Sequence, residues 1–467
     1  MSTIVVARML SPDELGVYAI AAALSAFAAE LKAFGVGSFL VRTDELTEAV
    51  VRRALGLTML ISWSLGATLL IGSGAFADFY GQADLQSLLW ILSVSFFLSP
   101  FLAIGGGLYS RHFEFGTYTA IQISSQTLQL AVVVTLILAG WSYHSLAIAT
   151  ACGAFMQLAL MGIFKPPGFV WKPRFARLAE IAKFGVSVSI SNMLRRLALS
   201  LPDLVIGKLG TVREVALFSR GIGFLDFIEV TLRRSVQPVA LPFLSQVKRE
   251  DGDVATAYAR AVGLTFMLMA PPLAVAGVAS LPTIRMFFGE QWVASADLVS
   301  ILAFWAIFRC VHALSPSVLV ASRLEHNLLV REIVLVIATL VGLVLTVPMG
   351  LPAVAVAIVF VGVLDFLYTS VLLHKTVGLR AGLLARTLAP GILVSVFCAA
   401  AVWGLSFGLD FRDGNAFVVC FAVASVSGIT WLSGVVILRH PVLDELGHLL
   451  RPVLTRLGIF QRAGRNE

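Results

Sequence analysis

Charged side chains interrupt two consecutive apolar segments, residues 187–206 and 217–244, and they are the side chains of this protein best suited to bind a ligand. They are Arg195, Arg196, Asp226, Glu229, Arg233 and Arg234. A cation at the centre of a membrane-spanning helix costs about 2.5–3.5 kcal/mol on insertion scales, so such residues normally face a bundle interior or a water-filled cavity. A cluster on two consecutive helices therefore predicts a polar interior that binds an anion.

A cationic lining is the first hypothesis for these side chains, because a guanidinium group offers forked donors that match the oxygens of a phosphate. The predicted substrate-binding residues are Lys32, Asn192, Arg195, Arg196, Arg233, Arg234 and Arg309. The alternative is structural pairing, because Glu229 and Arg233 stand four residues apart on one helical face and would satisfy each other. Lys32 is also near enough to the predicted interface for its side chain to reach water.

Acidic residues at membrane depth form a second set, which consists of Glu30, Asp226, Glu229 and Asp365. Carboxylates inside a membrane mark proton or sodium relays, so these residues are the ion-coupling candidates, with a proton gradient and a sodium gradient both open. Pairing with the arginines is again the alternative. The histidines and the four cysteines lack metal-ligand spacing, so we predict no metal, no cofactor and no catalytic residue.

The composition indicates a membrane protein. Of the 467 residues, 58% are hydrophobic and 13% are charged, and the mean hydropathy is +0.91. Soluble domains have about 45–50% apolar and about 25% charged residues. Because cytoplasmic loops of membrane proteins carry an excess of lysine and arginine, the net charge of +7 reflects orientation and does not predict nucleic-acid binding.

About thirteen spanning helices, each of about 20 residues, fit the apolar runs. The segments are 13–40, 54–78, 85–109, 117–139, 144–164, 182–207, 215–245, 258–285, 294–321, 329–348, 351–373, 384–408 and 415–438. Alternate loops differ in charge. One set carries most of the lysines and arginines, and the other carries Arg8, Lys208, Arg213, Arg285 and Arg412. The cation-rich set and the C-terminus are therefore predicted to be cytoplasmic.

The chain contains an internal duplication. The matches are residues 53–60 with 260–267, Phe79-Tyr-Gly81 with Phe287-Phe-Gly289, and Arg8, Glu14 and Tyr18 with Lys208, Glu214 and Phe218. Each match lies on one predicted membrane side in both halves, which indicates a parallel repeat. We predict an all-α polytopic membrane protein with two parallel-repeat six-helix lobes around a central cavity plus two trailing helices, its first helix largely missing. The predicted domains are an N-terminal lobe with a truncated first helix (1–181), a C-terminal lobe (182–379), two trailing transmembrane helices (380–440) and a cytoplasmic amphipathic tail (441–467).

The loop Ala7-Arg-Met-Leu-Ser-Pro-Asp-Glu-Leu-Gly-Val-Tyr-Ala19 resembles a known family. A loop of the form Ala-Arg-Leu-Leu-(Ser/Gly)-Pro-x-Glu-x-Gly-x-Tyr is typical of polysaccharide-transport flippases, the Wzx-like and colanic-acid-exporter-like branch of the multidrug/oligosaccharidyl-lipid/polysaccharide exporter superfamily. The resemblance implies that an undecaprenyl-pyrophosphate-linked oligosaccharide crosses the bacterial inner membrane by alternating access. It implies a role in O-antigen, capsule or exopolysaccharide synthesis, without ATP hydrolysis by the chain, so we expect no enzyme.

Two related transport functions stay open as alternatives. An ion-coupled multidrug exporter of the same superfamily would need an acidic cavity for cationic drugs, whereas cations outnumber carboxylates at depth here. A flippase for the peptidoglycan lipid precursor would share a cationic lumen. A membrane-embedded glycosyl-transfer or polymerase enzyme would need a large external loop, and every predicted loop is short. The predicted partners are a polyprenyl-pyrophosphate oligosaccharide and membrane lipid, with polysaccharide polymerase machinery left open.

Overall fold

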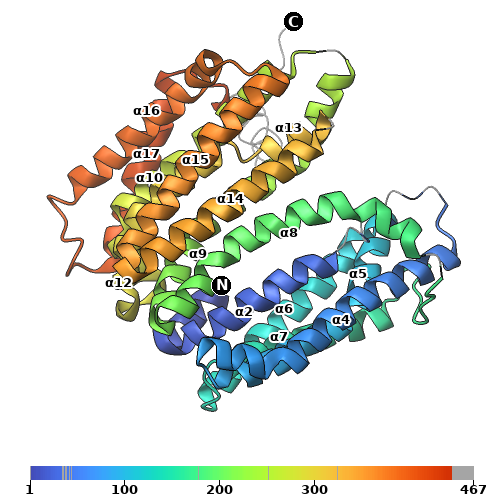
Figure 1. The fold of residues 1–467 in the computed structure, drawn as a ribbon. Helices are drawn as coiled ribbons and strands as arrows, with labels where there is room; N and C mark the ends of the chain where they lie inside the picture. Colours follow the sequence, from blue (N-terminus) through green and yellow to red (C-terminus); the bar gives the residue numbers. More distant parts are fainter. Residues whose placement is uncertain are drawn as a thin grey trace, which may run out of the picture. The chain divides into compact units, whose positions relative to one another are not determined.

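The structure, a computed structural model, describes residues 2–443 apart from 34, 35, 37, 38, 41, 42, 44, 177, 251 and 323. Side chains are described for the same residues except 2–3, 31–33, 179–189, 191–192, 232–246, 248–249, 320–321 and 325. Helices are joined by turns and short loops, and no strand occurs within these ranges. The all-α prediction is confirmed (Figure 1).

The order of the helices follows the predicted spans closely. They are α1 (Ser2–Met9), α2 (Pro12–Ala33), α4 (Glu48–Tyr80), α5 (Asp84–Arg111), α6 (Phe115–Leu138), α7 (His144–Ile163), α8 (Leu178–Leu209), α9 (Val212–Arg249), α10 (Val254–Val278), α11 (Ser280–Phe288), η1 (Glu290–Trp292), α12 (Ala294–Val311), α13 (Ser315–Ala321), α14 (Glu325–Thr346), η2 (Val347–Met349), α15 (Leu351–Val377), α16 (Ala381–Leu405) and α17 (Ala416–Ile437). A helix of the structure therefore overlaps each predicted span.

Two of the predicted spans contain a break, so that each consists of two helices, although Ala294–Leu319 together still form one segment long and apolar enough to cross a membrane. The segment 258–285 separates into α10 and α11, and the segment 294–321 separates into α12 and α13. A proline stands in the first turn after each break. Pro282 cannot donate to the carbonyl of Val278, and Pro316 cannot donate to that of His312, so each helix ends before the proline-containing turn.

Local sequence also sets where helices begin and end. Asp253 precedes α10 and accepts hydrogen bonds from the backbone N–H groups of Ala255 (3.0 Å) and Thr256 (3.2 Å), which are otherwise unsatisfied at a helix start. The hydrogen bonds from Thr256 hold the pKa of Asp253 below its ordinary value. At the other end of a span, Gly81 follows α4 with φ of 65°, a left-handed conformation that favours glycine.

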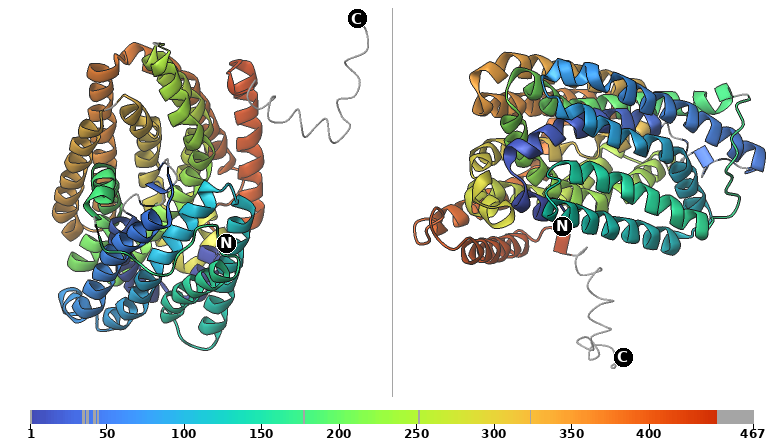
Figure 2. Two further views of the ribbon diagram at one scale, coloured as in Figure 1. Left: turned by 90° about the vertical axis from the view of Figure 1, so that its right-hand side faces the viewer. Right: turned by 90° about the horizontal axis from the view of Figure 1, so that it is seen from below.

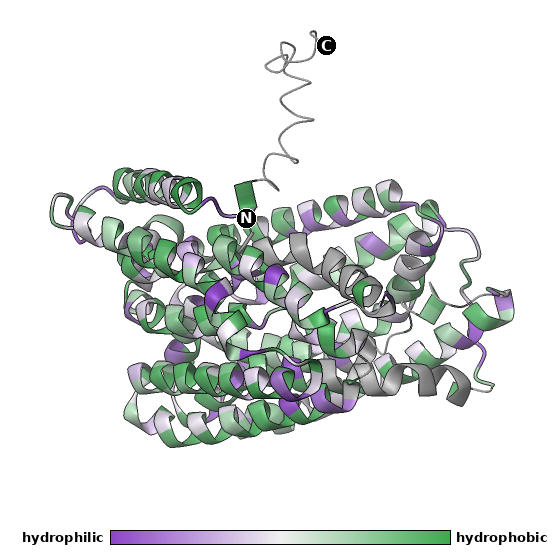
Figure 3. Cartoon of the chain, turned by 90° about the horizontal axis from the view of Figure 1, so that it is seen from above, coloured by the Kyte–Doolittle hydropathy of each residue, from purple (hydrophilic) through white to green (hydrophobic). Residues whose placement is uncertain are grey.

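The described residues include ten helical segments long and apolar enough to cross a membrane. Figure 3 shows hydrophobic residues along most of the helical surface, with hydrophilic positions scattered among them. Large apolar side chains such as Ile71 (83% exposed) and Ile437 (77% exposed) face outward. Such exposure suits contact with lipid, where a soluble protein would bury these groups. The chain is a multi-pass membrane protein.

Two compact units are recognised from the contacts within the chain. The first comprises residues 1–220, 287–295 and 325–357. In this unit α4 packs against α5, α6 against α7, and α2 and α14 against α8. The helices α2 to α7 can be followed in the blue to teal part of Figure 2. The unit includes segments on both sides of the predicted boundary at residue 181, and the lobe boundaries themselves stay a prediction.

The second unit comprises residues 221–286, 296–324 and 358–467. Its most extensive packing joins α10 to α16, and α17 packs on α16. Glycines permit the close approach: a Cβ on Gly263 would lie 2.4 Å from the Thr387 side chain, and one on Gly391 would lie 2.6 Å from the Phe266 ring. The predicted amphipathic tail lies outside the described residues beyond position 443.

Candidate transport site

An arginine within a spanning segment contacts two carboxylates in the second unit. Arg309 on α12 donates from Nε to Oε2 of Glu229 at 2.7 Å. Its Nη2 also donates to Glu229 and to Asp226, both on α9. The side chains are 21% exposed for Arg309, 5% for Glu229 and 32% for Asp226. We call these three residues the triad.

Helical spacing explains how the triad forms. Asp226 and Glu229 are three residues apart, so both project from one face of α9. Arg309 stands in the last turn of α12, and its guanidinium also lies 4.1 Å from the centre of the Trp305 ring. Residues 305 and 309 are one helical turn apart, so the indole covers the guanidinium from its own helix. The cation is thus held by charge on one side and by an aromatic face on another.

The triad gives Glu229 a partner on another helix, Arg309. Its predicted pairing with Arg233 stays a prediction, because the Arg233 side chain lies outside the described residues. Arg309 was predicted to bind an anionic substrate, and Asp226 and Glu229 were predicted to couple transport to an ion. The structure brings these three side chains into contact. Asp365 on α15 is buried and accepts a hydrogen bond from Thr369 at 3.0 Å. Glu30 is half-buried on α2.

The other predicted substrate-binding residues lie on α2, α8 and α9. Arg195 is exposed and Arg196 is half-buried, both on α8 in the first unit. Arg196 interacts electrostatically with Asp203, which also accepts a hydrogen bond from Ser219. For Lys32, Asn192, Arg233 and Arg234 the helical backbone is described, but the side chains lie outside the described residues.

A buried polar network beside Arg309 was missed by the sequence analysis. His312 follows α12, and its Nδ1 lies 3.0 Å from the hydroxyl of Tyr258 while its Nε2 lies 2.9 Å from the hydroxyl of Ser370. The imidazole also stacks on Phe366 of α15, with the ring centres 5.5 Å apart. The network ties α10 and α15 to the turn that follows α12, about one helical turn from Arg309. No spacing along the sequence could show it, because its members are more than fifty residues apart.

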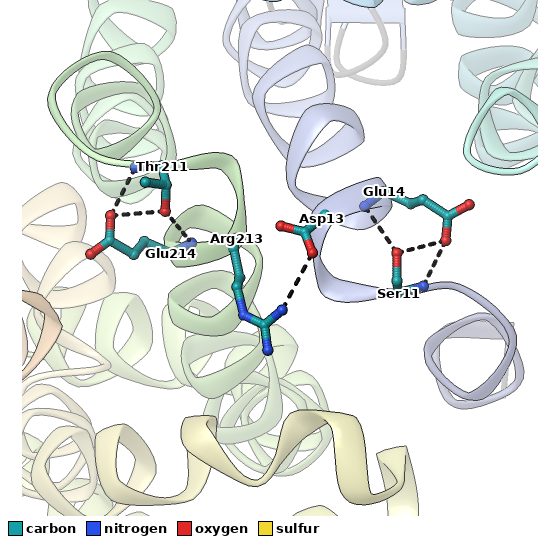
Figure 4. Close-up of polar contacts among 6 residues, drawn as sticks. All are labelled: Ser11, Asp13, Glu14, Thr211, Arg213 and Glu214. Carbon is teal, nitrogen blue, oxygen red and sulfur yellow. Dashed lines mark hydrogen bonds and ion pairs between the residues drawn. The ribbon is translucent and has the colours of Figure 1, made fainter.

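The starts of α2 and α9 carry the same capping box, two hundred residues apart. In the first, the N–H and Oγ of Ser11 both lie 2.8 Å from Oε2 of Glu14. In the second, the N–H and Oγ1 of Thr211 lie 2.8 and 3.0 Å from Oε2 of Glu214. This reciprocal arrangement satisfies the free N–H groups of a helix start. Figure 4 shows the two boxes and, between them, an ion pair of Asp13 with Arg213 at 3.4 Å.

The signal for these boxes was present in the sequence. Glu14 and Glu214 were already matched by the internal repeat, and Ser-x-x-Glu or Thr-x-x-Glu before an apolar run is a helix-start pattern. The ion pair between Asp13 and Arg213 had no such signal, because it joins residues that only the fold brings together.

The fold is similar to that of two solved membrane transporters. The chain is similar to a solved structure of the lipid II flippase MurJ in an inward closed conformation, with a TM-score of 0.75, 13% identity and coverage of 95% of this chain and 97% of the other. It is also similar to an inward-facing multidrug resistance MATE transporter, with a TM-score of 0.62, 15% identity and coverage of 81% and 96%. At sequence identities this low, the similarity shows a shared fold and nothing about the substrate.

The family is shown by the sequence itself. Residues 5–297 match the family model described as polysaccharide biosynthesis protein, and the chain belongs to that family. It is 23% identical over 291 residues to the teichuronic acid biosynthesis protein TuaB of Bacillus subtilis, covering 62% of this chain and 60% of that protein. It is 23% identical over 307 residues to the succinoglycan biosynthesis transport protein ExoT of Rhizobium meliloti, covering 64% and 60%. The matched region thus spans about 60% of the length of these curated relatives. The resemblance seen in the loop at residues 7–19 is confirmed.

Proposed function

We propose that this protein is a flippase that moves an undecaprenyl-pyrophosphate-linked oligosaccharide from the inner to the outer leaflet of the bacterial inner membrane. Alternating access carries the substrate across, for O-antigen, capsule or exopolysaccharide assembly, and the chain performs no catalysis. The triad is the observation that carries the proposal. A guanidinium inside a spanning segment is a group that a pyrophosphate can engage once a carboxylate gives up its place.

The triad supports a particular order of events. The Nε and Nη2 donors of Arg309 point at carboxylates, so a pyrophosphate binds these two nitrogen atoms only when a carboxylate gives up its place. Asp226 is the more exposed partner at 32%, against 5% for Glu229. Asp226 is therefore the one to be displaced, while Glu229 holds the guanidinium in place. The displaced carboxylate is then free to take a proton or a sodium ion, which would couple transport to an ion gradient.

The orientation is part of the proposal. The cation-rich loops and the C-terminus face the cytoplasm. Arg195 and Arg196 on α8 and the side chains of Lys32, Asn192, Arg233 and Arg234 are further substrate contacts, and Glu30 and Asp365 are further ion-coupling residues. Polysaccharide polymerase machinery is a candidate receiver of the translocated lipid.

A strain that lacks the gene tests the proposal. Lipid-linked oligosaccharides are extracted and quantified, and surface polysaccharide is measured in the same cells. We expect polyprenyl-pyrophosphate oligosaccharide to accumulate while surface polysaccharide disappears. Unchanged lipid pools with raised sensitivity to cationic drugs would contradict the proposal and favour the multidrug exporter. Accumulation of the peptidoglycan lipid precursor would favour that flippase instead, a function for which the MurJ-like fold is the specific observation.

Complementation with Arg309→Lys tests the role of the triad. Lysine keeps the charge but loses the planar fork that binds two phosphate oxygens, so we expect export to fall about tenfold or more at normal protein abundance. Arg412→Lys makes the same change in an exposed loop and is the matched control. In Asp226→Asn we expect export to lose its dependence on the ion gradient. Wild-type export in Arg309→Lys would remove the triad from the substrate path.

A further inference from the structure

Two contacts in the first unit are equivalent to each other by the internal repeat. In each, a cationic side chain of one repeat donates to the backbone carbonyl of a phenylalanine in the other repeat. The side chain of Lys208, at the end of α8, donates to the carbonyl of Phe79 and lies 4.2 Å from the centre of its ring. Arg8, at the end of α1, donates from Nε to the carbonyl of Phe287 at 3.3 Å. Lys208 is the repeat equivalent of Arg8, and Phe287 is the repeat equivalent of Phe79. Each repeat therefore reaches the other through an equivalent cation.

The acceptors have a common physical role. Phe79 stands in the last turn of α4, and Phe287 stands in the last turn of α11. The last carbonyls of a helix lack partners within the helix and carry the negative end of its dipole. A lysine or arginine from the opposite repeat satisfies such a carbonyl and interacts favourably with the dipole.

Equivalent residues of the two repeats also meet each other. Asp13 and Arg213 stand at matching positions of the two capping boxes, and they form the ion pair in Figure 4. In a contact with two-fold symmetry, residue i touches j and j touches i, and residues on the axis meet their own equivalents. The exchanged contacts and the Asp13–Arg213 pair fit one such axis.

The backbones come close at the same place. A Cβ on Gly16 would lie 1.8 Å from the carbonyl oxygen of Val212, so α2 and the start of α9 touch through main-chain atoms. Any larger residue at position 16 would push the two helix starts apart. The contact between the repeats at this end is thus direct, with no layer of side chains between them.

We propose that Arg8, Asp13, Phe79, Lys208, Arg213 and Phe287 form a clasp that closes the outer end of the transport path and must open to release the substrate. This rests on the proposed function and its orientation. Arg8, Lys208 and Arg213 belong to the small set of cations in the loops predicted to face outward. Few cations are expected there, and these three serve contacts between the repeats.

Several side chains of the clasp are exposed to water, which makes their contacts easy to break when the clasp opens. The side chains of Asp13 and Arg213 are each 57% exposed, and Phe79 is 52% exposed. Ion pairs this exposed add little to stability and exchange readily with water. Water can therefore replace the contacts when the repeats separate, which a buried salt bridge would resist.

The two halves of the clasp are unequal. Beside Arg8, the side chains of Gln291 and Trp292 donate to the carbonyl of Ala7 at 2.6 and 2.7 Å, and Trp292 is fully buried. The Lys208 half has an exposed cation and an exposed ring. Asp13, Arg213 and Lys208 are thus the residues whose replacement alters the clasp without disturbing a buried core.

Thiol labelling tests the clasp without any substrate. A reporter, Ala216→Cys, stands at the repeat equivalent of Gly16 and is buried. A membrane-impermeant maleimide is added from outside to the full-length protein in cells. We expect Asp13→Arg to raise the labelling rate about fivefold, the population shift that an exposed ion pair can produce. Asp13→Arg combined with Arg213→Asp should return the rate to that of the reporter alone. Equal rates in all three proteins would overturn the proposal.

Cross-linking tests whether opening is required. Asp13→Cys with Arg213→Cys is joined by a bifunctional thiosulfonate reagent, and export is measured before and after reduction. We expect export to be lost on cross-linking and to return on reduction. The control pair, Asp410→Cys with Arg412→Cys, lies within one exposed loop and should export normally. Normal export by the fully cross-linked clasp would overturn the proposal. Labelling that responds as expected in a protein that exports no oligosaccharide would retain the clasp and contradict the proposed function alone.

Discussion

Two arginine–carboxylate contacts in this protein differ in their surroundings. The Asp13–Arg213 pair is 57% exposed on both sides and measures 3.4 Å. In the triad, Arg309 is 21% exposed, its partner Glu229 is 5% exposed, and an indole ring covers the guanidinium. Exposed charges are screened by water and salt, whereas charges withdrawn from water interact strongly and are costly to separate. The same pairing of arginine with carboxylate therefore gives an easily broken contact at Asp13 and Arg213, and a firmly held cation at Arg309.

The largest effect is expected when the triad is left without its cation. Arg309→Ala strands two carboxylates in a spanning segment, and removal of one partner from a buried ion pair costs about 3–5 kcal/mol. The measurement is thermal unfolding of the purified protein in detergent. The control combines Arg309→Met with Asp226→Asn and Glu229→Gln, which removes every charge of the triad and should restore most of the stability. An unfolding temperature of Arg309→Ala equal to that of the wild type would show that the carboxylates do not depend on Arg309.

A smaller loss is expected from Gly16→Ala. The new Cβ would lie 1.8 Å from the Val212 carbonyl oxygen, and overpacking of this kind costs about 1–3 kcal/mol. Gly223→Ala is the matched control in α9, because a Cβ there would meet nothing within 4 Å. Alanine is the better helix former, so the control should gain up to about 1 kcal/mol. Equal stability of the two variants would mean that the main-chain contact at Gly16 is not required.

The contribution of the Trp305 ring to the stability of the protein is expected to be smaller than that of Gly16. Trp305→Phe keeps a ring near Arg309 but weakens the cation–π contact, which predicts a loss of about 1 kcal/mol. Trp403→Phe changes the same residue type at a position 60% exposed and should leave the unfolding temperature unchanged. A Trp305→Phe variant as stable as this control would assign the holding of Arg309 to the carboxylates alone.

The smallest effect is expected at the exposed pair. Asp13→Asn should lower stability by about 0.5 kcal/mol or less, because exposed ion pairs contribute little. That difference should vanish in 1 M salt, where the screening length is about 3 Å. The Arg309→Ala loss should persist in the same buffer, since charges shielded from water are screened much less. A salt-sensitive loss at Arg309 with a salt-insensitive one at Asp13 would reverse the comparison.

The sequence predicted the helices because their signal is local. An apolar run of about 20 residues identifies a spanning helix wherever the chain later folds, and a helix of the structure overlaps each predicted span. The divisions before Pro282 and Pro316 were missed, although proline chemistry lies within the same short segments. The capping boxes at Ser11 and Thr211 were likewise readable from a four-residue pattern.

Pairing between distant residues was decided by the tertiary structure. Glu229 binds Arg309, which is eighty residues away along the chain. The Tyr258–His312–Ser370 network joins residues with no common spacing, and the repeat that matches Asp13 with Arg213 did not predict that the two would meet. The sequence by itself determined that charges lie within apolar spans, that the chain repeats, and which family it belongs to. Which charge meets which depends on helix rotation and packing over distances that local periodicity does not encode, so only the folded chain could decide it.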